Sequence, residues 1–511
     1  MGKGGFYITT AIDYVNSLPH VGTAYEKIAA DVIARFKRLE GFDVRFLMGN
    51  DEHSINVRKE ALARRQSPAE YCGEMAKRFE EIWRRLNISY DDFIRTTQDR
   101  HRLAVQKLFQ RIYDSGDIYK GNYEGWYCES CEAFLKDGDL KGGKCPTHNI
   151  EPRWIKEENY FFALSRYQTR LLEVIDKNPD FILPEVRRNE VLSLIKGGLE
   201  DISISRSTFD WGVTVPGDRV HVVWVWFDAL TNYISALGYG EDNRLFGRYW
   251  PAALHVIGKD IIRFHCALWP AMLISAGLEL PKCIFAHGFV YLKGEKMSKS
   301  LGTIVQPLDV VDRFGADALR YFLLREVPFG QDGDFSWERF VDRYNSDLAN
   351  DLGNLVSRTI TMAEKYVEGK VPDGRSGSRG RQLAGKALEV VDNVQGYMAS
   401  YQLHSTLTEI WELVREANRY IEAKAPWVLA RDSGRRKELE EVLYDLLEAI
   451  RYIAILLYPF IPGKSREIWE QLRIEEELAA QRLDDLGEWG RMSPGSRVRK
   501  GEPIFPRIKG D

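Results

Sequence analysis

FYITTAIDYVNSLPHVGTAYEKIAADVIARFKRLEGFDVRFLM, residues 6–48, is the stretch that decides the fold. Its first six residues, 6–11, are β-branched and aromatic and predict a strand. Apolar residues then recur at helical spacing until Gly41, which ends the predicted helix, and 44–48 is predicted to be the next strand. Strand, helix and strand within about 45 residues predict a parallel sheet with a right-handed crossover.

The composition of the 511-residue chain is that of a globular protein with two to four domains. The start of the chain lacks the features of a signal peptide, and the longest apolar runs are far short of a membrane span. We therefore expect a cytoplasmic protein without a membrane partner. The net charge is −4, so an RNA partner must be bound by local basic surfaces. No DNA partner is expected.

Changes of pattern divide the chain into five segments. We expect the first half of an α/β domain at 1–118, an insertion at 119–215, the second half of the α/β domain at 216–290, a linking segment at 291–345, and a helical domain at 346–511.

Shorter patterns predict the elements of the later segments. In the second half of the α/β domain, strands are predicted at 221–227, 254–257 and 283–286, and a helix at 261–273. In the helical domain, long helices are predicted at 350–366, 384–401, 405–422 and 437–457, with a polar loop at 372–381.

Pro19-His20-Val21-Gly22-Thr23 lies between the first strand and the first helix. A helix N-terminus offers free backbone N–H groups and the positive end of the helix dipole, and both suit phosphate. Gly22 lets a nucleotide approach the backbone, and His20 can donate to phosphate oxygens. A capping turn explains the same residues, so this segment alone leaves both readings open.

Gly294-Glu295-Lys296-Met297-Ser298-Lys299-Ser300-Leu301-Gly302 is a second unusual segment. Lys296 and Lys299, with serines and flanking glycines, predict a cationic loop that closes over a polyphosphate and neutralises its charge.

Together these segments resemble the HIGH and KMSKS signatures of class I aminoacyl-tRNA synthetases. The resemblance implies a Rossmann-type catalytic domain that forms an aminoacyl-adenylate from ATP, with Mg²⁺ on the pyrophosphate, and then loads tRNA. It implies ATP binding by His20, Gly22, Thr23, Lys296, Ser298 and Lys299. Thr23 stands where the signature has His and cannot supply a cation, so catalysis is expected to depend mainly on His20, Lys296 and Lys299.

The insertion carries Cys128-Glu129-Ser130-Cys131 and then Cys145-Pro146-Thr147-His148. Cys128, Cys131, Cys145 and His148 form a ligand set suited to one tetrahedral Zn²⁺. All four positions are filled, so the zinc is expected to be structural. The other cysteines (Cys72, Cys266 and Cys283) are scattered and are predicted to be buried thiols.

A zinc knuckle at this place resembles the connective insertion of methionyl-tRNA synthetases, of the bacterial type without a C-terminal dimerisation domain. Segments 10–14, 49–53, 225–230 and 258–261 resemble the family's methionine pocket, and the likeness covers essentially the whole chain. The partners it implies are L-methionine, ATP and tRNA(Met), with a monomeric enzyme. The methionine-binding residues it implies are Ala11, Ile12, Tyr14, Asp51, Trp226, Ala229, Leu230, Tyr233, Ile261 and His265.

The chemistry of these residue types agrees with a methionine site. A carboxylate such as Asp51 can hold an α-ammonium group by a charge-assisted hydrogen bond. Apolar and aromatic side chains suit an unbranched thioether, and Tyr14 and His265 can offer polar contacts to its sulfur. One departure from the family is Ser54, where a glycine is common, and it leaves the local turn geometry open.

The helical domain resembles the anticodon-binding domain of the family. The segments concerned are 353–358 and 417–427, and they imply tRNA contacts from Asn354, Arg358, Asn418, Pro426 and Trp427. Amides can read base edges, an arginine can contact base or phosphate, and a tryptophan can stack on an unpaired base. Helix packing also explains Pro426 and Trp427.

Three alternatives remain from the sequence. The first is cysteinyl, leucyl, isoleucyl or valyl specificity, which needs either an open zinc site or a large editing insertion. The second is a nucleotidyltransferase with a His-x-Gly-His element, which needs no helical domain. The third is a catalytically inactive tRNA-binding relative, which Lys296 and Lys299 disfavour.

Overall fold

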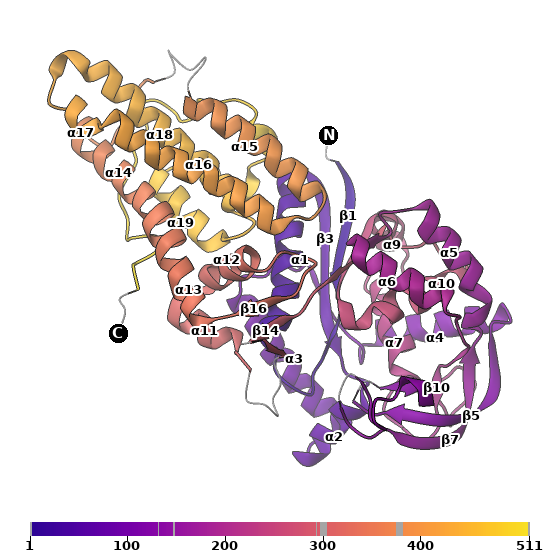
Figure 1. Cartoon of the computed structure of the whole chain (residues 1–511). Helices are drawn as coiled ribbons and strands as arrows, with labels where there is room; N and C mark the ends of the chain where they lie inside the picture. Colours follow the sequence, from indigo (N-terminus) through magenta and orange to yellow (C-terminus); the bar gives the residue numbers. More distant parts are fainter. Residues whose placement is uncertain are drawn as a thin grey trace.

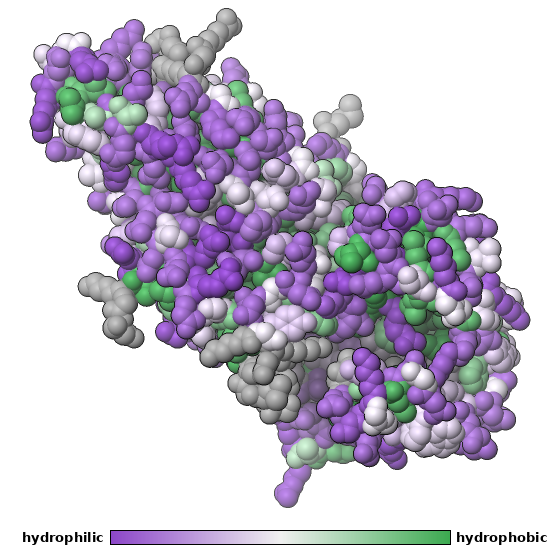
Figure 2. Space-filling model, viewed as in Figure 1, coloured by the Kyte–Doolittle hydropathy of each residue, from purple (hydrophilic) through white to green (hydrophobic). Residues whose placement is uncertain are grey.

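The computed structural model describes residues 3–130, 132–146, 149–292, 294–296, 304–374 and 382–508. An α/β part and a bundle of long helices lie at opposite ends of the molecule, with α1 and α12 between them (Figure 1). Of the described helices, none is long and apolar enough to cross a membrane. Hydrophilic residues cover most of the face shown in Figure 2.

A parallel sheet forms the centre of the α/β part. Its strand order is β3-β1-β12-β13-β8, with β4 on the other edge of β3 and β2 also paired to β3. Its strands are β1 (Lys3–Thr10), β2 (Asp13–Tyr14), β3 (Phe42–Asp51), β4 (Asp92–Arg95), β8 (Ile182–Leu183), β12 (Ala253–Gly258) and β13 (Cys283–His287). The chain passes from β1 to β3 on one side and later returns to β12 on the other. Such a switch in strand order leaves a crevice at the carboxyl ends of the strands.

The predicted first unit is confirmed. Helix α1 (Val21–Leu39) joins β1 to β3, and Gly41, at φ 88°, turns the chain back into the sheet. Left-handed backbone of this kind favours glycine. The other helices on the sheet are α2 (Ile55–Ala63), α3 (Pro68–Arg85), α4 (Asp99–Asp114), α7 (Val225–Leu230), α8 (Asn232–Ser235), α9 (Arg244–Tyr249) and α10 (Trp269–Ser275).

The strand predicted at 221–227 is wrong beyond its first residues. Only Val222–Val223 form a strand, β11, which pairs with β10 (Ser205–Arg206), and α7 begins at Val225. Five of the six residues of α7 are buried, so its apolar run carries no helical period. A short apolar run of this kind does not distinguish a buried helix from a strand. The strands predicted at 254–257 and 283–286 are confirmed as β12 and β13.

The insertion forms a separate antiparallel sheet of order β6-β5-β7-β9. Its strands are β5 (Ile118–Cys128), β6 (Ala133–Leu135), β7 (Arg153–Phe162) and β9 (Ile202–Ser203). The same stretch of chain also contains α5 (Gln168–Lys177) and α6 (Glu185–Lys196). It contains β8 as well, which pairs with β13 in the central sheet.

A small sheet, β15-β14-β16, follows the central one. Its strands are β14 (Val290–Leu292), β15 (Glu295–Lys296) and β16 (Gly333–Phe335). The helices around it are α11 (Pro307–Phe314), α12 (Ala316–Glu326) and α13 (Trp337–Arg343).

The helical domain contains the long helices that the sequence predicts. They are α14 (Asn354–Val367), α15 (Gln382–Ala399), α16 (Leu403–Lys424) and α18 (Arg436–Leu457), with the shorter α17 (Pro426–Leu429) and α19 (Pro462–Leu472). Most of the loop predicted at 372–381 lies outside the described residues.

Two apolar cores hold these parts together. One lies between the central sheet and α1, and it continues through α12 into the bundle. The other lies on the opposite face, among α4, α7 and α10. The crevice at the strand ends therefore has a packed wall on each side.

Candidate functional site

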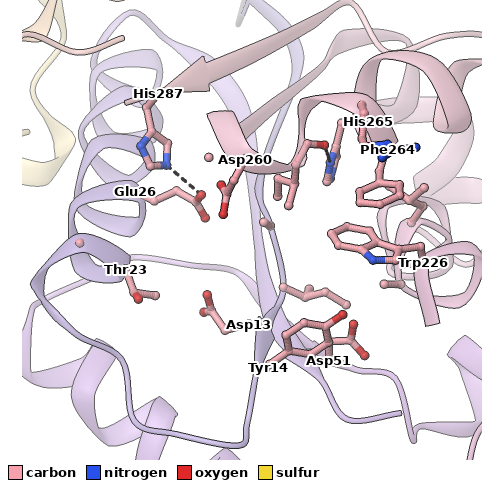
Figure 3. Close-up of a pocket in the computed structure, with 18 of the residues that line it drawn as sticks. Asp13, Tyr14, Thr23, Glu26, Asp51, Trp226, Asp260, Phe264, His265 and His287 are labelled. Atoms are coloured by element: carbon pink, nitrogen blue, oxygen red, sulfur yellow. Dashed lines mark hydrogen bonds and ion pairs between the residues drawn. The ribbon is translucent and has the colours of Figure 1, made fainter. Parts of the chain in front are cut away.

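A cavity of about 560 Å³ opens at the carboxyl ends of β1, β3 and β12. Figure 3 shows two regions in it, with Thr23, Glu26 and His287 on the side of α1, and Trp226, Phe264 and His265 on the other. All of the predicted methionine-binding residues line it (Ala11, Ile12, Tyr14, Asp51, Trp226, Ala229, Leu230, Tyr233, Ile261 and His265). His20, Gly22 and Thr23 line it as well. The structure thus brings these two sets of residues to one cavity.

Asp51 is a buried carboxylate at the end of β3. Its side chain lines the cavity, the residue is only 3% exposed, and its Oδ1 has no hydrogen-bond partner among the described residues. Burial raises its pKa well above the usual range, and Asp228 and Glu132 raise it further. The His53 backbone bonds the carboxylate, but a buried oxygen left without a partner is costly, so this position favours a cationic ligand group.

Asp228, on α7 behind Asp51, has its charge compensated internally. His53 Nδ1 lies 2.6 Å from one of its oxygens and His101 Nε2 lies 2.7 Å from the other. Although burial opposes ionisation, the two histidines lower the pKa of Asp228 to about 2. This arrangement ties β3, through His53, to the helix that carries Trp226 and Ala229. The sequence did not point to Asp228 as a central residue, because its two partners, His53 and His101, come from two other segments.

Ser54 does not strain the turn that follows Asp51. Its φ of −88° is ordinary, and its hydroxyl oxygen accepts from the backbone N–H groups of Asn56 and Val57 at the start of α2. The hydroxyl donates to Glu132 Oε1 at 2.5 Å. Glu132 follows directly after the predicted metal ligand Cys131, so Ser54 connects the knuckle to the cavity.

Aromatic rings form the wall opposite α1. Trp226 stacks on Phe264 at 3.9 Å between centroids, and Tyr233 stacks on His255 at 4.1 Å. His265 Nδ1 lies 3.1 Å from the Ile261 carbonyl oxygen and therefore donates to it, so Nε2 accepts from the Tyr233 hydroxyl at 2.7 Å. Burial lowers the pKa of His265 to about 4, which keeps the ring neutral. Both of its nitrogens are engaged, so His265 orients Tyr233, and its contact with the methionine sulfur stays a prediction.

His20 caps α1 at the other region of the cavity. Its Nδ1 accepts from the Thr23 backbone N–H at 3.3 Å. A Cβ on residue 22 would lie 2.8 Å from the His20 ring, so any other residue there would displace the histidine from its capping position. This contact gives a second reason for glycine at position 22, besides the close approach of a nucleotide expected from the sequence.

A buried charged network lies beside this helix end and was not predicted. Lys27 Nζ contacts Asp13 Oδ1 at 2.9 Å, Glu26 Oε1 at 2.7 Å and the Ala11 carbonyl oxygen at 2.9 Å. Glu26 Oε2 lies 3.0 Å from His287 Nε2 (Figure 3). Burial raises the pKa of Asp13 to about 6, and its Oδ2 has no partner among the described residues. Lys27 thus fixes the loop of the cavity wall to the helix that is predicted to bind phosphate.

The structure describes only part of the predicted cationic loop at 294–302. Lys296 lies in β15, whose backbone pairs with Tyr291 of β14. Ser298 and Lys299 lie outside the described residues. At the knuckle, Cys128 and Cys145 are buried free cysteines, whereas Cys131 and His148 lie outside the described residues.

The predicted RNA-contacting residues lie on the bundle, far along the chain from the cavity. Arg358 pairs with Glu422 at 2.7 Å, and its guanidinium lies 5.9 Å from the centre of the Trp427 ring. Asn354 is exposed, whereas Pro426 is buried. The Asn418 amide nitrogen donates to the Asp351 and Val414 carbonyl oxygens, and its contact with a base edge stays a prediction.

Comparisons with known proteins agree on one family. The family described as "tRNA synthetases class I (M)" matches residues 6–153 and 139–360, and the "Anticodon-binding domain of tRNA ligase" matches 381–490. The methionine–tRNA ligase of Caldanaerobacter subterraneus subsp. tengcongensis is 50% identical over 508 residues, which are 99% of this chain and 79% of the relative. That of Thermotoga maritima is 46% identical over 509 residues, covering 98% of this chain and 80% of the relative.

Solved structures give the same result. Mycobacterium tuberculosis methionyl-tRNA synthetase in complex with methionyl-adenylate is 44% identical, with a TM-score of 0.95 over 99% of this chain and 100% of that one. The free state of the same enzyme gives 0.86, covering 99% of each chain. The fold described above is therefore closer to the adenylate complex than to the free state.

Proposed function

The chain belongs to the methionine–tRNA ligases, a family of class I aminoacyl-tRNA synthetases, and on that premise we propose how its cavity performs the reaction. The reaction activates L-methionine with ATP to methionyl-adenylate and pyrophosphate, and then transfers methionine to the 3′ end of tRNA(Met). The observation that carries the proposal is the buried Asp51 carboxylate, whose Oδ1 has no hydrogen-bond partner among the described residues, in the cavity whose other region is the capped N-terminus of α1.

Asp51 binds the α-ammonium group of methionine, and the aromatic wall surrounds the thioether. This places the substrate carboxylate toward α1, where it attacks the α-phosphorus of ATP in line while pyrophosphate leaves. No general base is required, because the attacking carboxylate is already ionised. His20 and the N-terminus of α1 bind phosphate oxygens, and Lys296 and Lys299 stabilise the charge that develops on the leaving group.

Zn²⁺ is proposed as a structural ion of the insertion. Cys128 closes β5 before the turn into β6, and Cys145 begins a second turn, in which its carbonyl oxygen accepts from the Asn149 N–H. The first cysteine of each predicted ligand pair therefore lies at the start of a turn, and the thiols of Cys128 and Cys145 are buried. These features fit a Cys₃His site, in which zinc supplies folding energy to the knuckle and no catalytic chemistry.

Mg²⁺ is proposed to accompany ATP. The orphaned Oδ2 of Asp13 is an oxygen donor of the kind that Mg²⁺ prefers, so Asp13 would hold the ion beside the phosphates of ATP. When bound, the ion neutralises phosphate charge. Lys27 holds Asp13 through the other carboxylate oxygen.

The bundle is proposed to bind the anticodon arm through Asn354, Arg358 and Trp427. The proximity of Arg358 to the half-buried Trp427 supports this, because a guanidinium and an exposed ring edge together suit an unpaired base. We further propose a monomer that acts in the cytoplasm.

Methionine-dependent exchange of pyrophosphate into ATP tests the proposal. Exchange is expected with L-methionine, and not with cysteine, leucine, isoleucine or valine at equal concentration. Exchange with another amino acid would overturn the assignment of the pocket. Absence of exchange together with retained tRNA binding would identify a catalytically inactive relative.

A further inference from the structure

A second cavity, of about 330 Å³, lies between the C-terminal end of α1 and the helical domain. Three arginines line it: Arg35 and Arg38 from α1, and Arg466 from α19. The remaining lining residues are Leu39, Asn87, Ile88, Ser89, Tyr458, Leu478, Ala479 and Gln481. From Gly22 to Arg38, the rise of an α-helix amounts to about 24 Å, so this cavity is separate from the one at the N-terminus of α1.

Two of the guanidinium groups converge on one tyrosine. Arg35 Nη1 donates to the Tyr458 hydroxyl oxygen at 3.3 Å, and Arg466 Nη2 approaches the same oxygen at 3.5 Å. Their guanidinium carbons lie 5.4 and 5.6 Å from the centre of the Tyr458 ring. Two like charges gathered at one oxygen repel each other, and an anion between them would remove that repulsion.

The carboxylates around the cavity do not balance its cations. Asp31 bonds Arg35 but is shared with the buried Arg320, and Asp91 bonds Arg38. Arg466 has no ion pair with any described residue. The helix dipole accounts for basic residues in the last turns of α1, but not for Arg466, which belongs to another helix.

We propose that this cavity binds a small phosphate-bearing anion, free phosphate or a phosphate monoester. Guanidinium groups match phosphate oxygens in geometry and charge, and the amides of Asn87 and Gln481 add neutral donors on the same wall. Leu39, Ile88 and Leu478 lie beside the arginines and provide an apolar surface for an organic group. A bound anion joins α1 of the catalytic part to α19 of the helical part.

Arg466→Met tests the site without touching the catalytic cavity. Arg466 is exposed, and among the described residues its hydrogen bond and its ring contact are with Tyr458, so the variant is expected to fold and to keep methionine-dependent exchange. Arg170→Met is the matched control, because Arg170 is an exposed arginine on α5 whose one ion pair with a described residue is with Glu173. Binding of inorganic phosphate is measured by calorimetry, and the melting temperature is measured with phosphate against chloride at equal ionic strength.

Wild type and Arg170→Met are expected to bind phosphate at this site and to gain melting temperature from it. Arg466→Met is expected to bind about tenfold more weakly or worse, since a hydrogen bond to a charged group is lost. Equal phosphate affinity and equal thermal gain in all three proteins would overturn the proposal, because the catalytic cavity would then account for all binding.

Adenosine monophosphate distinguishes the two sources of the anion. Tighter binding than inorganic phosphate, lost in Arg466→Met, supports a phosphate monoester as the ligand. Equal or weaker binding than phosphate, with the same dependence on Arg466, supports free phosphate.

Discussion

Asp51→Asn separates binding of the methionine ammonium from the folding of its pocket. The substitution keeps the shape of the side chain and removes its charge. Asp51 is 3% exposed, so solvent screens its interaction with a bound cation little. Leaving a buried charge without its partner costs about 3–5 kcal/mol, and the Asn oxygen still accepts one hydrogen bond. We therefore expect the methionine KM to rise about 100- to 1,000-fold.

The same change is expected to stabilise the free protein. Burial, Asp228 and Glu132 raise the pKa of Asp51, so the ionised carboxylate destabilises the folded state at neutral pH. For a carboxyl group with a raised pKa, stability falls as pH rises from the unfolded pKa to the folded pKa. Asn removes this dependence, and the melting temperature at pH 7 is expected to increase. For the same reason, the methionine KM of the wild type should rise on acidification, whereas that of the variant should not.

Pyrophosphate exchange at varied methionine concentrations, together with thermal denaturation from pH 5 to 8, measures both effects. Asp43→Asn is the control, because Asp43 lies at the opposite end of β3, where it bonds Tyr249 and pairs with Arg248, away from the cavity. A methionine KM changed less than tenfold would refute the role of Asp51. A joint loss of stability and activity would show that the carboxylate belongs to the fold.

Four other outcomes are expected. Lys299→Ala should lower the single-turnover rate of adenylation by about 10²–10³ while the methionine KM stays constant, and an effect on KM alone would contradict the loop's role. Asp228→Asn should lower the free energy of unfolding by about 3–5 kcal/mol in urea denaturation, since His53 and His101 lose a buried acceptor; a loss below 1 kcal/mol would be inconsistent. Trp427→Ala should spare exchange and reduce tRNA charging, and loss of both would make it a folding residue. Chelation of zinc should expose the knuckle to protease while the bundle stays intact, and unchanged cleavage would argue against a structural metal.

Local order along the chain made several features predictable. The first strand, α1 and β3 follow one another directly, so their periodicity, the stop at Gly41 and the place of His20 were available from the sequence. The Cys-x-x-Cys and Cys-x-x-His spacings that begin at Cys128 and Cys145 also predict the zinc ligands, because they need no knowledge of the tertiary structure. The short apolar run at 225–230 has no helical periodicity, and the first residues of its helix, 225–227, were predicted to be part of a strand.

Tertiary structure alone decided the electrostatics of the site. Asp51, Asp228 and Glu132 are far apart in sequence, and only packing shows that Oδ1 of Asp51 is buried without a hydrogen-bond partner among the described residues. The charged network around Lys27 and the arginines beside Tyr458 were hidden for the same reason. Periodicity depends on neighbours a few residues apart, whereas the pKa of a buried group depends on charges and burial contributed by several distant segments. The sequence therefore determined which elements form and which chemical groups they carry, and the fold determined which of those charges remain unpaired.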